Sequence, residues 1–277
     1  FLPYLCRPMK HPNETKSFFF TPNCFGERRT YGRIILAGSL FTLLFALVSR
    51  GFYHPDEHYQ ILEYAHLKLF GAASTDYLPW EYHAMMRPGL QPFIAWVLGR
   101  GLLAAGLYSP FALVALLQLL SGVFSLFSLC MLFRAVYDEL GTACRRRWFL
   151  YVGLFLCFEV YLHVHFTAEM AAGNLLVLLA ARTLRLHRTA PASEFRSGML
   201  LGLLAGLTFA VRYQAGFALA GYGLWLLCYH RRWRLFAGMV PGVLLALAIG
   251  LLTDYWFYGE WTVVPYNYLE ENILNAH

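Results

Sequence analysis

Long apolar stretches are the feature that most limits what this chain can fold into. They lie at 35–48, 111–133, 148–162 and 235–253, and together they contain a single charged residue. A helix needs about 20 apolar residues to cross the roughly 30 Å hydrocarbon core of a bilayer. Only 14% of the residues are charged, whereas soluble domains carry about a quarter. The sequence therefore predicts an all-α, multi-pass transmembrane helical bundle.

The net charge of +6 does not indicate a nucleic-acid partner. Nucleic-acid binders present a continuous basic face, but here the basic residues form short clusters between the apolar stretches. The six cysteines have no CxxC spacing, so they indicate neither a redox motif nor a compartment. We expect membrane lipids, and no nucleic acid, among the partners of this chain.

Clusters of arginine predict the orientation of the bundle, because cytoplasmic loops carry an excess of positive residues. The clusters are Arg28, Arg29 and Arg33; Arg134 with Arg145, Arg146 and Arg147; Arg182, Arg185 and Arg188; and Arg231, Arg232 and Arg234. With all of them on the cytoplasmic side, residues 1–33 form a cytoplasmic N-terminal tail. Residues 34–277 form the membrane core, which we expect to be incomplete at its C-terminus.

This arrangement predicts seven membrane spans and one helix that does not cross. The predicted spans are 34–50, 110–133, 148–164, 169–186, 197–211, 214–229 and 235–253. Residues 90–107 hold Arg100 at their centre, which costs about 2.5–3.5 kcal/mol on insertion, and Pro88 and Pro92 lie at their start. We therefore expect an interfacial or re-entrant helix there.

The same topology places most of the remaining ionisable residues on the opposite, non-cytoplasmic face. They lie in the segments 51–89, 163–169, 212–213 and 254–277. Ionisable groups at membrane-facing ends are costly and often functional. The alternative for any one of them is an ordinary polar loop, but several on one face predict a site.

The densest group of polar residues follows the first predicted span, from His54 to Glu63. Pro55 suits a first helical position, and Asp56 and Glu57 then fall in the first turn, where the helix dipole favours carboxylates. Gln60 and Glu63 are expected on the same helical face as Asp56. The alternative is that two acids in a first turn only stabilise the helix.

A metal site is not expected here, and neither is a required cofactor. His54 and His58 are four residues apart, which suits a metal on a regular helix, but His54 precedes Pro55 near the cap and no third ligand follows from the spacing. A divalent metal remains an open but unsupported option.

Two arginines stand out on the non-cytoplasmic face. Arg212 lies at the tip of a predicted hairpin, where the positive-inside bias would not place it, and it suits a phosphate or sugar. Its alternative role is to snorkel toward lipid headgroups. Arg87 follows the aromatic and acidic residues Trp80, Glu81 and Tyr82, and an interfacial aromatic belt also explains the aromatic members of that group.

At these residues the chain resembles the Alg9-like mannosyltransferase family from about residue 34 onward. The matching motifs are His54-Pro55-Asp56-Glu57-His58-Tyr59-Gln60 with Glu63, His66 and Gly71; Trp80-Glu81-Tyr82; Arg87-Pro88 with Pro92; Asp254-Tyr255-Trp256-Phe257-Tyr258-Gly259-Glu260-Trp261; and Val264-Pro265-Tyr266-Asn267-Tyr268 with Asn272. The first and last blocks carry most of the specificity. Arg87-Pro88 departs from the Arg-Ser that is common in the family, and the resemblance covers only the N-terminal half of a member.

The resemblance implies a GT-C-like fold and an inverting glycosyltransferase of GPI-anchor or N-glycan assembly. Such an enzyme moves mannose from a polyprenyl-phosphate-mannose donor to a lipid-linked glycan acceptor on the luminal or periplasmic face. The membrane would be that of the endoplasmic reticulum in a eukaryote and the plasma membrane in a bacterium.

Inverting transfer needs a base and a stabilised leaving group, and the residues above supply candidates for both. Asp56 is our predicted base, with Glu57 as the second candidate. Arg87 or Arg212 is expected to stabilise the departing lipid phosphate. The other predicted substrate-binding residues are His54, Gln60, Glu63, Glu81 and Asp254.

Two other readings stay open at this point. A transporter or flippase also carries charges inside a membrane, although such proteins usually contain internal repeats and the His54–Glu57 block has no second copy. An inactive, truncated family member is the other. A metalloprotease is weaker still, since no HExxH motif occurs.

Overall fold

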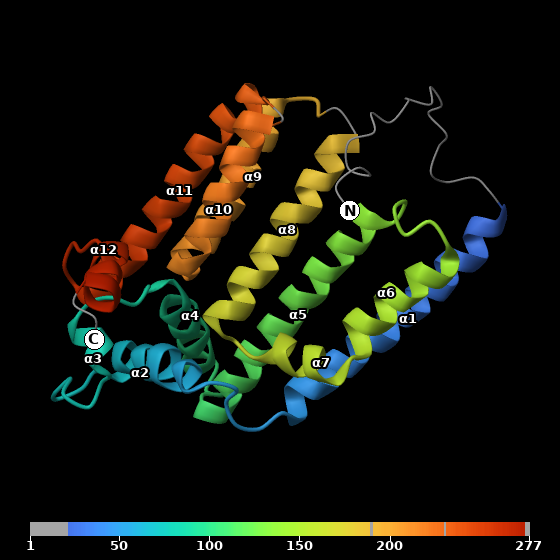
Figure 1. Ribbon diagram of the computed structural model, residues 1–277. Helices are drawn as coiled ribbons and strands as arrows, with labels where there is room; N and C mark the ends of the chain where they lie inside the picture. Colours follow the sequence, from blue (N-terminus) through green and yellow to red (C-terminus); the bar gives the residue numbers. More distant parts are fainter. Residues whose placement is uncertain (1–21, 189–190, 230, 275–277) are drawn as a thin grey trace.

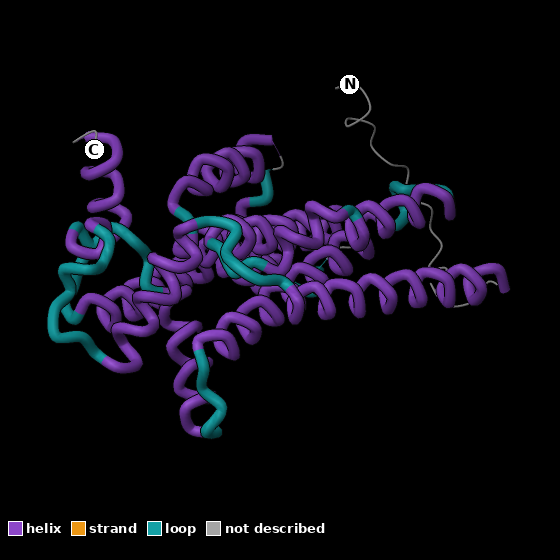
Figure 2. Tube along the Cα trace, turned by 90° about the horizontal axis from the view of Figure 1, so that it is seen from below, coloured by secondary structure: helices purple, strands orange, loops and turns teal. Residues whose placement is uncertain are grey.

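The computed structural model describes residues 22–188, 191–229 and 231–274. Within these residues the regular structure is entirely helical, and Figure 2 shows helices joined by loops. The predicted all-α class is confirmed. Most of the predicted N-terminal tail lies outside the described residues, but its end is helical, because α1 (Pro22–Val48) begins twelve residues before the predicted start of the first span.

Four more long helices run beside α1 in a row. They are α5 (Pro110–Val136), α8 (Ala168–Arg188), α9 (Glu194–Val211) and α11 (Trp233–Tyr258) (Figure 1). Contacts link α1 with α5, α5 with α8, α8 with α9 and α9 with α11. Each of these helices therefore packs against its neighbours in the row. Many large apolar side chains of the row stay exposed on its outer surface.

Local signals in the sequence account for several helix ends. The Ser109 hydroxyl accepts a hydrogen bond from the Ala112 N–H at 3.0 Å, and Pro110 takes the first position of α5. Ser193 caps α9 in the same way. Helix α11 ends at Gly259, whose φ of +82° suits a residue without a side chain.

The predicted span at 148–164 is broken into two helices. Helices α6 (Ala143–Phe155) and α7 (Cys157–Val164) meet at an angle of 54°, and Leu156 between them has an extended backbone. The predicted span at 214–229 is also irregular, since it consists of a 3₁₀ turn, α10 (Gly216–Leu224) and the π-helix η4 (Trp225–Tyr229).

Four of the described helices are long and apolar enough to cross a membrane, or five if the bent α6–α7 pair forms one span. The four are α1, α5, α9 and α11. Seven spans were expected, so the predicted number of crossings is not established. Helix α4 (Leu90–Ala104) has 15 residues and is about 22 Å long, which is too short for the full hydrocarbon core. Its interfacial or re-entrant placement stays a prediction.

The direction of the helices separates two chemically different ends of the molecule. Helices α1, α9 and α11 begin at the end where α5 and α8 finish (Figure 1). All of the arginine clusters lie there, and we call this the arginine end. The opposite end, which we call the loop end, carries η2 (Glu57–Leu62), α2 (Glu63–Phe70), α3 (Trp80–His83), α4 and α12 (Val264–Leu269). The segments predicted to share the non-cytoplasmic face thus gather at one end.

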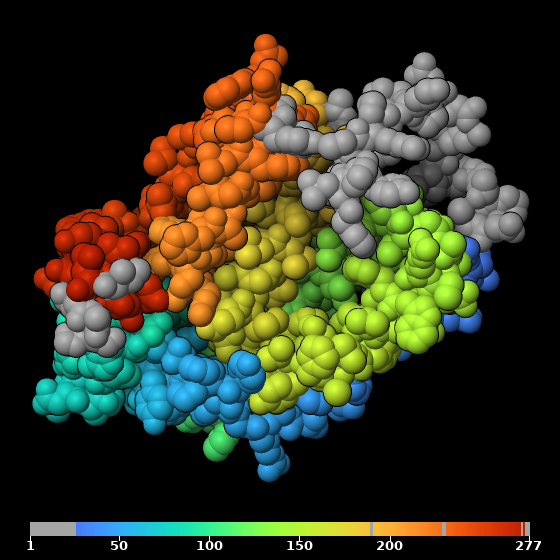
Figure 3. Space-filling view, viewed as in Figure 1, coloured from blue at the N-terminus to red at the C-terminus, as the bar shows by residue number. Residues whose placement is uncertain are grey.

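Segments far apart in the sequence are joined at the loop end. Figure 3 shows the blue and teal residues after α1 beside the red C-terminal residues. The Asn267 amide donates to the Met85 carbonyl at 3.1 Å, and the Tyr258 hydroxyl donates to the Arg87 carbonyl at 2.8 Å. These bonds hold the 80–90 segment against α12 and against the end of α11.

Glycines bring α9 and α11 into backbone contact. A Cβ atom on Gly202 would lie 2.0 Å from the Met239 carbonyl oxygen, and one on Gly242 would lie 2.1 Å from the Met199 carbonyl oxygen. Small residues at a spacing of four allow this close approach in membrane helices. The contact fixes the loop after α9 relative to the end of α11, and both segments reach the loop end.

We predict that Gly202→Ala destabilises the protein, because the added methyl group collides with backbone that cannot rotate away. Overpacking of this kind costs about 1–3 kcal/mol, which lowers the midpoint of thermal unfolding in detergent. The control is Gly221→Ala in α10, where the added methyl group meets no atom within 4 Å. Equal midpoints for both variants would contradict the role of the α9–α11 contact.

Candidate active site

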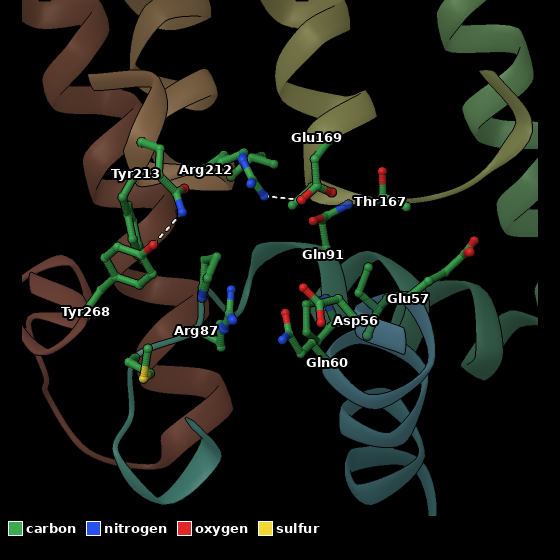
Figure 4. A pocket seen from close by; sticks show the side chains of 17 residues that line it. Asp56, Glu57, Gln60, Arg87, Gln91, Thr167, Glu169, Arg212, Tyr213 and Tyr268 are labelled. Carbon is green, nitrogen blue, oxygen red and sulfur yellow. Dashed lines mark hydrogen bonds and ion pairs between the residues drawn. The ribbon is translucent and has the colours of Figure 1, made fainter. Parts of the chain in front are cut away.

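A polar cleft lies at the loop end, and five separate parts of the chain form it (Figure 4). The space between its lining atoms, including the part that is open to solvent, is about 550 Å³. The start of η2, the segment before α4, the start of α8, the residues after α9 and α12 all contribute. Its polar residues are Asp56, Glu57, Gln60, Arg87, Gln91, Thr167, Glu169, Arg212, Tyr213, Gln214 and Tyr268.

The carboxylate of Asp56 points into this cleft and is accessible. As expected, the helix opens at Pro55, with Asp56 in its first turn. The Asp56 side chain is 36% exposed, and its carboxylate lies 3.3 Å from Nδ1 of the more exposed His54. A substrate in the cleft therefore meets a carboxylate that no strong partner occupies.

Glu57 has a different environment although it is the adjacent residue. It is buried, and its carboxylate accepts from the Phe166 N–H at 3.0 Å, lies 2.9 Å from Nδ1 of His165 and accepts from the Tyr53 N–H at 3.3 Å. In Figure 4 its side chain points away from Asp56. These bonds tie the start of η2 to the loop between α7 and α8, so we assign Glu57 a positioning role.

Arg87 is held toward the cleft by Glu81. Its guanidinium forms an ion pair with one oxygen of the Glu81 carboxylate, and the Gln60 amide donates to the other oxygen at 2.8 Å. Burial by itself lowers the pKa of Arg87, but the hydrogen bond to Glu81 and the charge of that carboxylate outweigh it, so the pKa is raised. Arg87 is therefore a permanent cation with a restrained side chain, and its buried Nε has no hydrogen-bond partner among the residues that the structure describes.

Gln91 is a polar residue of the cleft that the sequence analysis missed. It lies in the first turn of α4 and is only 4% exposed. Its side-chain nitrogen has no hydrogen-bond partner among the described residues. A buried donor without a partner costs about 1–3 kcal/mol, so its persistence in a cleft suggests that a ligand accepts from it. A glutamine in an apolar helix gives no sequence signal for this role.

The starts of three helical segments meet at the cleft and make it attractive to anions. Helix α4 begins at Leu90, α8 begins at Ala168 after Thr167, and the segment with η2 begins at Pro55. Each N-terminus carries a partial positive charge and N–H groups without helical partners. Together with the guanidinium of Arg87, these termini form a site suited to a phosphate.

Arg212 lies on the opposite side of the cleft, at the end of α9. Its guanidinium forms an ion pair with Glu169 at the start of α8, and both side chains are partly exposed. Beside them the Gln214 amide donates to the Tyr268 hydroxyl. Arg212 is therefore at the cleft, but a ligand must share it with Glu169.

The structure places the other predicted site residues outside the cleft lining. His54 flanks Asp56, and Glu81 supports Arg87, as described above. Glu63 pairs with His58 at 3.1 Å instead. The expected face shared by Asp56 and Glu63 does not form, because η2 is a π-helix with wider turns.

Asp254 is buried in α11 and has a structural contact. Its carboxylate accepts from the Gly89 N–H at 2.7 Å, directly before α4. A Cβ on Gly89 would lie 2.6 Å from the Thr253 carbonyl oxygen, so the two segments touch through backbone. Asp254 therefore orients α4, and with it Gln91. Its predicted contact with substrate stays untested.

The sequence of this chain matches a family of known proteins. The profile of the Alg9-like mannosyltransferase family matches residues 34–277. This chain belongs to that family. Within the described residues no three His, Cys, Asp or Glu side chains are grouped to hold a metal ion, and the expectation that none is required stays a prediction.

Several curated members of the family are similar to this chain at low identity. Mannosyltransferase APTG1 of Arabidopsis thaliana is 26% identical over 92% of this chain and 46% of its own length. GPI mannosyltransferase 4 of Eremothecium gossypii is 28% identical over 84% of this chain and 49% of its own length. GPI alpha-1,2-mannosyltransferase 3 of Bos taurus is 24% identical over 79% of this chain and 39% of its own length. The chain spans about half the length of these relatives, and no solved structure matches it.

We predict that Glu57→Gln lowers stability, because the amide nitrogen cannot accept the bonds that the carboxylate accepts. Hydrogen bonds to charged groups contribute about 1.5–3 kcal/mol each, so the thermal midpoint in detergent should fall clearly. Glu63→Gln is the control, since it removes one half-exposed pair. If Glu57→Gln unfolds at the wild-type temperature, the assigned positioning role is wrong.

Gln91→Leu should keep or raise the thermal midpoint, because it removes a buried donor that has no partner among the described residues, and it should lower activity if a ligand accepts from that donor. Gln118→Leu in α5 is a matched control. Gln118 is also buried with an unpartnered side-chain nitrogen, but it lies away from the cleft. The measurement is the thermal midpoint together with transferase activity. Equal activity losses in both variants would refute the role of Gln91.

Proposed function

We propose that this protein catalyses inverting transfer of mannose from a polyprenyl-phosphate-mannose donor to a lipid-linked glycan acceptor. The observation that carries the proposal is the cleft, in which the accessible carboxylate of Asp56 lies among an anion-binding group of helix N-termini and Arg87. Membership of a mannosyltransferase family supports the sugar. Relatives named GPI mannosyltransferases support a GPI precursor as the acceptor and the endoplasmic reticulum as the membrane.

The position of the cleft suits two lipid substrates. It lies at the loop end, opposite the arginine clusters (Figure 1), and the positive-inside rule supports the luminal or periplasmic side for it. It is also next to the ends of apolar helices. Donor and acceptor are both anchored in the bilayer, and each can bring its polar headgroup to this depth while its chains stay in lipid.

In the proposed reaction the acceptor hydroxyl oxygen attacks C1 of mannose from the face opposite the phosphate. The new C1–O bond forms as the C1–O(phosphate) bond breaks, and the electron pair of the broken bond leaves with the lipid phosphate. Asp56 accepts the hydroxyl proton late, when the attacking oxygen has become more acidic. Because the acceptor oxygen attacks C1 directly on the face opposite the leaving phosphate, the anomeric configuration inverts without a covalent enzyme intermediate.

The leaving phosphate gains negative charge during this step, and the cleft is built to stabilise it. Arg87 stays charged, because its pKa is raised. The Arg87 Nε and the Gln91 side-chain nitrogen have no partner among the described residues, so both can donate to the phosphate. Charge-assisted hydrogen bonds to a phosphate are stronger than neutral ones. Arg212 joins them when the phosphate competes with Glu169. Removing one such donor from a preorganised site costs about 10²–10³ in rate.

The test uses membranes that contain the protein expressed from its complete reading frame, with radiolabelled polyprenyl-phosphate-mannose. We expect label in a lipid-linked glycan with the wild type, and about 10²–10⁴-fold less with Asp56→Asn, as is typical for loss of a general base. Asp76→Asn, an exposed residue of the same end outside the cleft, is the control. It should keep full activity.

Each outcome has a distinct meaning. Equal label with Asp56→Asn and the wild type rejects Asp56 as the base. No label from any variant, with the protein inserted and folded, rejects the donor assignment and favours a carrier. Transfer in detergent, without a sealed compartment, separates an enzyme from a carrier directly.

A further inference from the structure

A second hollow lies at the arginine end, far from the cleft. It lies between the end of α8 and the start of α9, and the space between its lining atoms, including the part that is open to solvent, is about 1,020 Å³. Its polar lining residues are Arg182, Arg185, Arg196, Ser193 and Ser197, and the other lining residues are apolar. No described carboxylate lines it. The proposed transfer reaction does not use this hollow.

Two neighbouring arginines outside the hollow form ion pairs with acidic residues, whereas no described carboxylate lines the hollow itself. Arg188 pairs with Asp138 at 3.3 Å, and Arg232 pairs with Glu194 at 2.8 Å. These acids are therefore already engaged. Arg182, in contrast, has a buried Nε without a hydrogen-bond partner in the described part of the chain. The positive-inside rule explains why arginines gather at this end, but it does not explain why Arg182 and Arg196 line a hollow that no described carboxylate lines.

The start of α9 adds to the positive potential. This helix has 18 residues, and Ser193 and Arg196 at its first turn both line the hollow. The helix N-terminus carries a partial positive charge. Guanidinium groups beside such a terminus favour a phosphate, which accepts several charge-assisted hydrogen bonds at once.

The surface next to the hollow is apolar and suits an acyl chain. Met199 and Leu200 follow Arg196 by three and four residues, which places all three on one side of α9. Their exposed fractions are 45% and 41%. Helix α9 is also one of the helices long and apolar enough to span a membrane. A molecule with a phosphate in the hollow can therefore lay its chain along this strip.

We propose that the hollow binds the phosphate headgroup of an anionic phospholipid from the leaflet opposite the cleft. Arg182 and Arg196 donate to the phosphate oxygens, and the acyl chain lies along Met199 and Leu200. Basic pockets between membrane helices are suited to such headgroups. The bound lipid then bridges α8 and α9, the two helices that carry Glu169 and Arg212 at their other ends.

The experiment titrates lipid-free protein in detergent with dioleoyl-phosphatidylserine, and in parallel with dioleoyl-phosphatidylcholine and with inorganic phosphate. Bound lipid is counted by native mass spectrometry, and the thermal midpoint is recorded. The variant is Arg182→Gln with Arg196→Gln. Its matched control is Arg145→Gln with Arg147→Gln, which removes the same charge from exposed positions at the same end.

We expect one phosphatidylserine to bind saturably and raise the midpoint in the wild type and the control. The hollow variant should bind it at least tenfold more weakly. Equal weakening in the control would overturn the site in favour of general attraction, and equal binding of phosphatidylcholine would overturn the selectivity for anionic lipid. Stabilisation by inorganic phosphate alone would overturn the lipid source. If Arg182→Gln impairs folding, exposed Arg196→Gln alone carries the same test.

Discussion

The buried carboxylate of Glu57 holds the candidate site together. Its bonds to His165, Phe166 and Tyr53 fasten the segment after α1 to the loop between α7 and α8. Asp56 precedes this anchor by one residue, so its position in the cleft follows from the anchor. A carboxylate that accepts several bonds in a buried place is costly to disturb. The same pair of adjacent acids therefore supplies one immobile group and one accessible group.

The rest of the cleft depends on contacts between backbones. The glycine contact of α9 with α11 sets where the residues after α9 emerge, and Asp254 holds the start of α4 against α11. Arg212 and Gln91 are thereby brought to the same cleft as Asp56. The lipid environment favours this construction, because helix packing in a membrane relies on close backbone approach and on few, well-satisfied polar contacts.

Both ends of the bundle have groups that suit anion binding, but the two ends differ in composition. At the loop end the positive groups lie around the accessible carboxylate of Asp56 and the carboxylates of Glu81 and Glu169, which already form ion pairs, and this combination suits the proposed reaction. At the arginine end the hollow is lined by arginines and serines and by no described carboxylate, which suits binding without a reaction. Helices α8 and α9 extend from one end to the other, so the same two helices contribute to both the cleft and the hollow.

The sequence was sufficient to predict the all-helical class, the opposite placement of arginines and other ionisable residues, and the helix start at Pro55. These follow from local quantities, namely apolar run length, charge and proline geometry. It also singled out Asp56, Arg87 and Arg212, which the structure brings to one cleft. Helix breaks were not predicted, because Leu156 and the π-turn of η2 reflect packing rather than a local breaker.

Tertiary structure alone decided the difference between Asp56 and Glu57, the support of Arg87 by Glu81 and the involvement of Gln91. Adjacent acids look equivalent in sequence, and only the partners that the fold brings from residues about 110 positions away distinguish them. Likewise, a glutamine becomes a candidate for ligand binding only when the fold buries its amide and leaves the amide without a hydrogen-bond partner. The sequence by itself determined which residues can reach the loop end, and packing decided which of them remain free to act.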